Sequence, residues 1–98
     1  MVKQKPPLNF DLARDKMPQY HIVLSNNDYV SAEYMVSVLS DVLHLKKEKA
    51  IELTNEVKSL NKTVVYTTHR ELAELKILQL TEYCLNNNQN LKFSLEKE

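Results

Sequence analysis

Glycine is absent from this 98-residue sequence, and cysteine occurs once, as Cys84. Without glycine the chain cannot form the glycine-rich loops that cradle phosphate groups, so its tight turns depend on Asn, Asp and Ser. A single cysteine cannot form an internal disulfide, which favours a reduced environment. The sequence also lacks an N-terminal apolar signal region and any apolar run long enough to span a membrane. We therefore expect a cytoplasmic protein.

An excess of charge of either sign is also missing, because 13 basic residues balance 13 acidic ones. Such a chain has little field with which to hold a phosphate backbone or an anionic lipid surface, so we expect no nucleic-acid or membrane partner. Its composition, 43% hydrophobic and 27% charged, is typical of a folded domain. A chain of this length closes one hydrophobic core.

Clustered catalytic or metal-binding residues are lacking as well. The potential ligands His21, His44, His69 and Cys84 fall on different predicted elements. No nucleophile is accompanied by a recognisable base and orienting group. We therefore expect neither a metal nor another cofactor, and we expect that the protein is not an enzyme.

Hydrophobic periodicity predicts six elements. Period-two or β-branched runs predict strands at residues 20–24, 63–67 and 91–96, and apolar residues spaced by three and four predict helices at 31–43, 46–60 and 69–85. Thr68 and Glu71 match a capping box that starts the last helix, which is apolar enough around its circumference to pack on more than one side. The last strand places Leu91, Phe93 and Leu95 on its inner face.

These elements predict one α+β domain. The order β-α-α-β-α-β gives a small open sandwich, in which a three-stranded sheet carries three helices on one face. All three prolines lie in residues 1–18, which lack a sustained apolar period. We expect a flexible N-terminal arm over 1–18 and a core domain over 19–98.

One polar cluster stands out, Ser25-Asn26-Asn27-Asp28 between the first strand and the first helix. These residue types form turns and cap helices, so a purely structural role is one interpretation. A binding site is the other.

The stretch Val23–Tyr29 resembles the Asn-Asp-Asp-Tyr turn of the ClpS family, adaptors of the ATP-dependent Clp protease. The strand at Thr63–Tyr66, the helix start at Thr68–Glu71 and the tail Ser94–Glu98 also fall where that family has its own. The resemblance extends over residues 19–98 without a gap. It implies a fold like that of ClpS and of the ribosomal stalk C-terminal domain.

The resemblance also implies a site for N-degrons, in which polar groups bind a substrate's free α-amino group beside a pocket for its first side chain, typically large and apolar. The amine-binding Asn of the family falls on Asn26, and its two acidic residues fall on Asn27 and Asp28. The residues that fall on or near the family's pocket positions are Val30, Ala32, Met35, Thr54, Val57 and Leu91.

This chain departs from the family at Lys58, where the amine-binding His falls, and at Asn61, where a nearby Gly falls. A lysine ammonium has no acceptor and repels a second ammonium. We therefore expect weak or altered recognition of N-terminal residues unless Lys58 turns toward solvent. Ala32 and Thr54 replace residues that are commonly bulkier, which also points to altered selectivity.

The resemblance further implies that Glu71 and Lys76 contact the N-terminal domain of a ClpA-type AAA+ unfoldase. The alternative is that Glu71 only caps its helix and Lys76 is only a solvated charge.

The leading hypothesis is an adaptor that delivers N-degron substrates to this unfoldase. The alternative is a divergent protein that binds the unfoldase but modulates it or reads another signal. A third hypothesis is that only the fold is shared, as with ribosomal stalk proteins. A catalytic role comes last.

Overall fold

The computed structural model describes residues 17–98. The predicted flexible arm, residues 1–18, therefore falls almost wholly outside the described residues.

The described residues form six elements in the predicted order. They are β1 (Gln19–Ser25), α2 (Ala32–Leu43), α3 (Lys47–Leu60), β2 (Lys62–His69), α4 (Arg70–Asn86) and β3 (Lys92–Lys97). Each lies within a few residues of its predicted range. No helix among them is both long and apolar enough to cross a bilayer.

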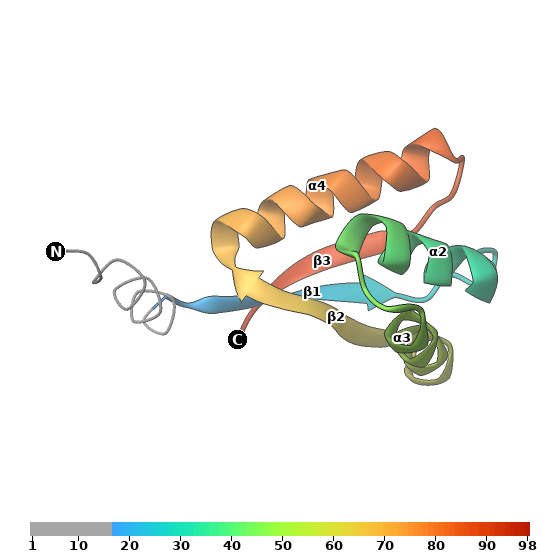
Figure 1. Ribbon diagram of the computed structural model, residues 1–98, viewed down its shortest axis with the longest axis horizontal. Helices are drawn as coiled ribbons and strands as arrows, with labels where there is room; N and C mark the ends of the chain where they lie inside the picture. The colour runs from blue at the N-terminus through green and yellow to red at the C-terminus, as the bar shows by residue number, and fades with distance from the viewer. Residues whose placement is uncertain (1–16) are drawn as a thin grey trace, which may run out of the picture.

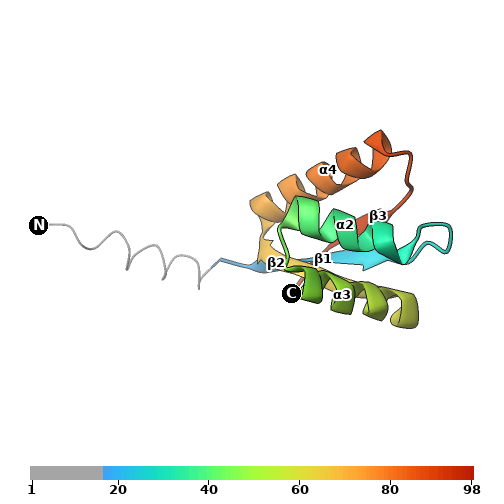
Figure 2. The same cartoon turned by 45° about the vertical axis from the view of Figure 1, so that its right-hand side comes forward.

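The strands form one antiparallel sheet in the order β2-β1-β3, with β1 at its centre (Figure 1). Ser25, the last residue of β1, pairs with Lys62 at the start of β2 and with Lys92 at the start of β3. The turn that leaves β1 therefore lies beside the segments that lead into both neighbouring strands. The three helices cover one face of the sheet, with α2 between α3 and α4 (Figure 2).

The core lies between this helical layer and the sheet. Ile22 and Leu24 in β1 are fully buried because the central strand is covered by both neighbours and by helices. Leu91 and Phe93 are buried and Leu95 is half-buried, as the alternation in the last strand predicted. The helices contribute buried apolar residues that each line one helix face, namely Met35, Val38, Leu39 and Leu43 from α2, Ala50, Leu53 and Val57 from α3, and Ala73, Leu80 and Cys84 from α4.

The predicted capping box at the start of the last helix is wrong. Thr68 belongs to β2, where it pairs with Tyr20 of β1, and His69 is the N-cap residue of α4. The His69 ring Nδ1 accepts a hydrogen bond from the backbone N–H of Leu72, at 3.5 Å. Sheet pairing therefore extends β2 past the point where local sequence would begin the helix, and Glu71 lies in the first turn.

The last helix packs on two sides, as its apolar circumference predicted, yet one of its faces stays exposed. It lies on all three strands and also against α2, where the Tyr34 and Tyr83 rings are 6.3 Å apart. Leu75, Leu78 and Leu85 are 48%, 60% and 66% exposed. Among residues 17–98 nothing covers these three leucines, because the small sheet and α2 occupy only the inner faces of α4.

Candidate functional site

The turn between β1 and α2 is shaped by Asn27. Its side-chain oxygen accepts a hydrogen bond from the Tyr29 N–H at 2.9 Å, and its backbone carbonyl accepts one from the Val30 N–H at 3.0 Å. Its side-chain Nδ2 donates to the Asn90 carbonyl at 2.6 Å, which ties the turn to the segment before β3. Asn27 therefore uses both ends of its amide within the protein and fixes the shape of the turn.

The turn residues do not cap the following helix. Ser31 is the N-cap residue of α2, and its hydroxyl accepts a hydrogen bond from the Tyr34 N–H at 3.1 Å. Asn26 and Asp28 instead contact each other, because the Asn26 Nδ2 donates to Asp28 Oδ1 at 3.0 Å. The helix-capping interpretation of this cluster is therefore wrong, since α2 already has its cap.

Asn26 carries an acceptor that no donor satisfies. With its Nδ2 bound to Asp28, its side-chain oxygen Oδ1 is buried, and no donor among residues 17–98 reaches it. Buried amide oxygens nearly always accept a hydrogen bond, so an unpaired one marks a place where a donor is missing. The carboxylate of Asp28 is exposed and adds acceptor capacity beside it. Together they form an acceptor pair of the kind that an ammonium group, with three donors, can satisfy.

Lys58 reaches this turn from α3. Its ammonium Nζ donates to the backbone carbonyl of Val30 at 2.8 Å. No carboxylate oxygen in the described part of the chain lies within 4.0 Å of this Nζ, so Lys58 is not ion-paired with Asp28. Lys58 is exposed, but the Val30 carbonyl holds its ammonium beside the turn, so the exception under which Lys58 extends away into solvent is not met.

Asn61 connects the end of α3 to the same turn. It is the C-cap residue of α3 with a left-handed backbone, φ 78°. Its carbonyl accepts a hydrogen bond from the Asn26 backbone N–H at 2.8 Å. Asparagine tolerates this conformation better than most residues, which explains how the chain manages without the glycine of the family here.

The predicted side-chain pocket is not one open cavity. Val30, Met35, Val57 and Leu91 are between 0% and 7% exposed and belong to the core. Ala32 and Thr54 border a cavity of about 390 Å³ between α2 and α3, together with Glu33, Val36, Ser37, Lys47, Ile51 and Asn55. Leu91 borders a different cavity of about 430 Å³ with Asn26 and Asn27, beside the starts and ends of the strands.

Sequence reasoning missed Val36, Ser37, Ile51 and Asn55 as residues of the cavity between α2 and α3. Ala32 and Val36 are four residues apart on α2, and Ile51 and Asn55 are four apart on α3, so each pair lies on one helix face. That periodicity is visible in the sequence. The pairing of these two faces is a tertiary feature that it does not specify.

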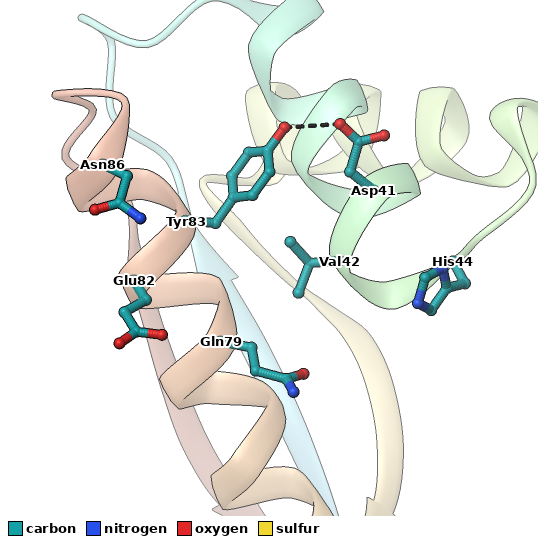
Figure 3. Close-up of a pocket in the computed structure, with 7 residues that line it drawn as sticks. All are labelled: Asp41, Val42, His44, Gln79, Glu82, Tyr83 and Asn86. Atoms are coloured by element: carbon teal, nitrogen blue, oxygen red, sulfur yellow. Dashed lines mark hydrogen bonds between the residues drawn. The ribbon is translucent and has the colours of Figure 1, made fainter.

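A further cavity of about 380 Å³ lies between α2 and α4 and contains none of the predicted site residues (Figure 3). The Tyr83 hydroxyl donates to Asp41 Oδ2 at 2.7 Å across it, and this hydrogen bond raises the pKa of Tyr83. His44 lies at the end of α2, away from this pair (Figure 3). Over residues 17–98 no three His, Cys, Asp or Glu side chains are grouped as metal ligands.

The two residues predicted to contact an unfoldase lie on α4. Glu71 is exposed in its first turn, and Lys76 is half-buried further along. The first turn of α4, which carries Glu71, lies at the opposite end of the sheet from the β1–α2 turn, because His69 pairs with Gln19 and not with the Ser25 end of β1 (Figure 1). The structure thus separates the predicted amine site from the predicted unfoldase contact.

Comparison with known proteins identifies the family of this chain. A family profile described as "ATP-dependent Clp protease adaptor protein ClpS" matches residues 15–94. The ClpS adapter protein of Pectobacterium carotovorum is 30% identical over 97 residues, covering 96% of this chain and 92% of that protein. The ClpS of Vibrio atlanticus is 32% identical over 78 residues, covering 80% of this chain and 74% of that protein.

Among solved structures, Agrobacterium tumefaciens ClpS2 bound to L-phenylalaninamide superimposes with a TM-score of 0.80 at 24% identity, covering 85% of this chain and all of that one. That structural likeness shows a shared fold, and the sequence matches show a shared family. On the profile match and the relatives together, the chain belongs to the ClpS family, whose members are adaptors of the ATP-dependent Clp protease rather than catalysts.

Proposed function

We propose that this protein binds substrates by their free N-terminal residue and delivers them to a ClpA-type AAA+ unfoldase. The observation that carries the proposal is the buried, unpaired Oδ1 of Asn26, held beside the exposed carboxylate of Asp28. A substrate α-ammonium donates up to three hydrogen bonds. It would satisfy the amide oxygen and the carboxylate at once.

Asp28 supplies most of the selectivity for charge in this arrangement. A hydrogen bond to a charged group contributes about 1.5–3 kcal/mol, against about 0.5–1.5 kcal/mol for a neutral one. An acetylated N-terminus has no positive charge and only one N–H, so it loses that difference. The L-phenylalaninamide bound by the Agrobacterium protein has a free α-amino group and an aromatic side chain, which supports the same class of ligand here.

Lys58 lowers the affinity for a substrate ammonium below that which the two acceptors of Asn26 and Asp28 would give alone. Its ammonium, fixed on the Val30 carbonyl, places a positive charge near the place proposed for the substrate's ammonium. Asn27 adds no compensating charge, since its amide is engaged with Tyr29 and Asn90. We expect affinity for N-terminal residues that depends on the amine but is modest and sensitive to salt.

The test is a fluorescence anisotropy titration with labelled peptides that begin in Leu, Phe, Tyr or Trp, each with a free and an acetylated N-terminus. We expect the free peptides to bind at least several-fold more tightly. Equal affinities for the two forms would refute amine recognition.

Delivery is tested separately with the N-terminal domain of a ClpA-type unfoldase. Glu71→Lys and Lys76→Glu are expected to weaken binding to that domain, whereas Lys92→Glu on β3 serves as a charge-matched control. Unchanged affinity in both α4 variants would exclude this surface as the contact.

The alternative function is a ClpS-like protein that binds the unfoldase but modulates it or reads another signal. The tethered Lys58 ammonium is the observation that favours it, because it disfavours a second cation. Binding to the unfoldase domain, together with equal affinity for free and acetylated peptides, would select this alternative.

A further inference from the structure

Thr54 is the only buried polar or charged side chain among residues 17–98, with 1% of its surface exposed. It lies on the inner face of α3 among apolar residues, three positions before Val57 and four after Ala50. Its hydroxyl Oγ1 has no hydrogen-bond partner in the described chain. A valine would fill the same volume without an unsatisfied hydroxyl, so packing alone does not account for a threonine here.

A threonine within a helix usually satisfies its hydroxyl on the carbonyl three or four residues earlier. Thr54 makes no such bond to the carbonyl of Ala50 or of Ile51. Its hydroxyl therefore remains free, as both a donor and an acceptor, for a group that comes from outside the chain.

The cavity between α2 and α3 brings such a group within reach. Thr54 borders this space of about 390 Å³, whose apolar walls include Ala32, Val36 and Ile51. The volume falls in the range of about 300–1,000 Å³ that is usual for small-ligand sites. Ser37 and Asn55 add neutral polar groups to the same lining, and Glu33 and Lys47 add one charge of each sign. An occupant with an apolar body and a neutral hydrogen-bonding tip matches these walls better than a purely apolar one.

The cavity lies beside the segment of α3 that leads to Lys58, whereas Asn26 borders the separate cavity next to Leu91. Thr54 and Lys58 are four residues apart on α3, so they lie on one face about 6 Å apart along the helix. Lys58 is bonded to Val30, and Ala32 on the cavity wall follows Val30 by two residues. One substrate residue can therefore extend its side chain along α3 toward Thr54 while its ammonium lies at Asn26 and Asp28.

We propose that the Thr54 hydroxyl makes this cavity select an N-terminal tyrosine over an N-terminal phenylalanine, by hydrogen bonding to the phenolic hydroxyl. The inference rests on the proposed recognition of free N-terminal residues and adds the substrate class. Phenylalanine fills the same space but leaves the buried Thr54 hydroxyl without a partner, as it is in the free protein. A site that offers a hydrogen bond discriminates against the ligand that lacks its partner.

The experiment is a double-mutant cycle with two peptides that differ only in a first Tyr or Phe, titrated against the wild-type chain, Thr54→Val and Thr54→Ser. One neutral hydrogen bond corresponds to about a 3- to 10-fold preference, so we expect the wild type to bind the Tyr peptide that much more tightly. Thr54→Val should reduce the preference to nearly one, because it keeps the volume and removes the hydroxyl. Thr54→Ser should keep the preference, because it retains the hydroxyl.

Two results would overturn the inference and leave the proposed function intact. One is equal affinity of the wild type for the two free peptides. The other is a Tyr preference that survives unchanged in Thr54→Val. Failure of both free peptides to bind more tightly than their acetylated forms would instead overturn the proposed function, and the inference with it. Thermal unfolding of both variants checks that each is folded, and a peptide pair with Tyr or Phe at the second position controls for contacts outside the cavity.

Discussion

Replacing Lys58 by methionine isolates the effect of its positive charge. Methionine keeps a long apolar side chain but loses the ammonium that donates to the Val30 carbonyl at 2.8 Å. Two consequences follow from the structure, and they have opposite signs. The fold loses a hydrogen bond, while the amine site loses a repelling charge.

The gain in affinity follows from Coulomb's law. Taking a separation on the order of 6 Å between the Lys58 Nζ and a substrate ammonium at Asn26 and Asp28, Coulomb's law gives a repulsion of about 0.7 kcal/mol in water and about 3 kcal/mol at an effective dielectric of about 20. Because Lys58 is exposed, the lower part of this range applies, and we take about 1 kcal/mol. Lys58→Met should therefore bind free-amine peptides about fivefold more tightly.

The loss of stability is measured in parallel. A hydrogen bond from a charged donor contributes about 1.5–3 kcal/mol, and water can partly replace the ammonium at this partly buried carbonyl. We expect urea denaturation to show a loss of about 1 kcal/mol in the free energy of unfolding.

Peptide titrations at low and high salt test whether the gain in affinity is electrostatic. The tightening should shrink as salt screens the charge, and acetylated peptides should be unaffected. Lys97→Met is the matched control, because Lys97 pairs with Tyr20 at the end of the sheet away from the turn. Weaker binding of free peptides by a folded Lys58→Met protein would show that the ammonium supports the site rather than opposing the ligand, and the reasoning would fail.

Three further predictions concern stability. Asn61→Ala should lower the free energy of unfolding by about 1 kcal/mol in urea denaturation, because alanine is strained at the left-handed φ of 78°. Asn61→Gly should not lower it, and an alanine variant as stable as wild type would contradict this explanation. Ser31→Ala should cost about 1 kcal/mol through loss of the α2 cap, with Ser37→Ala inside the same helix as a control that should change little. Burial raises the pKa of Tyr34 to about 12, from 10.0. The unfolded chain therefore loses this proton at lower pH than the folded protein does, and the free energy of unfolding should fall as pH rises above about 10. A Tyr34→Phe protein that loses the same stability at alkaline pH would exclude this cause.

The sequence specified the order of elements because each element carries its own periodicity. The alternation of Leu91, Phe93 and Leu95 required a half-buried strand, and the apolar spacing in α2 and α3 required amphipathic helices. The start of α4 was misplaced by one residue because pairing between β1 and β2 holds Thr68 in the sheet. Local capping signals are weaker than a continued ladder of strand hydrogen bonds.

For the candidate site, the sequence indicated which residues to consider but not how they interact. The family pattern indicated Asn26, Asp28 and Lys58, but their interactions depend on contacts between distant segments. Lys58 bonds a carbonyl 28 residues away, and Asn27 bonds one 63 residues away. Whether an amide oxygen is left unpaired depends on every neighbour in the fold, so it could not be read from the turn itself.

The role of Asn26 as an amine acceptor is tested most directly by the ratio of dissociation constants for acetylated and free forms of one peptide, measured on wild type and on Asn26→Ala. The wild type should give a ratio well above one, and the variant should bring it several-fold closer to one while the acetylated peptide binds as before. A ratio of one in the wild type, or an undiminished ratio in a folded Asn26→Ala protein, would contradict the account.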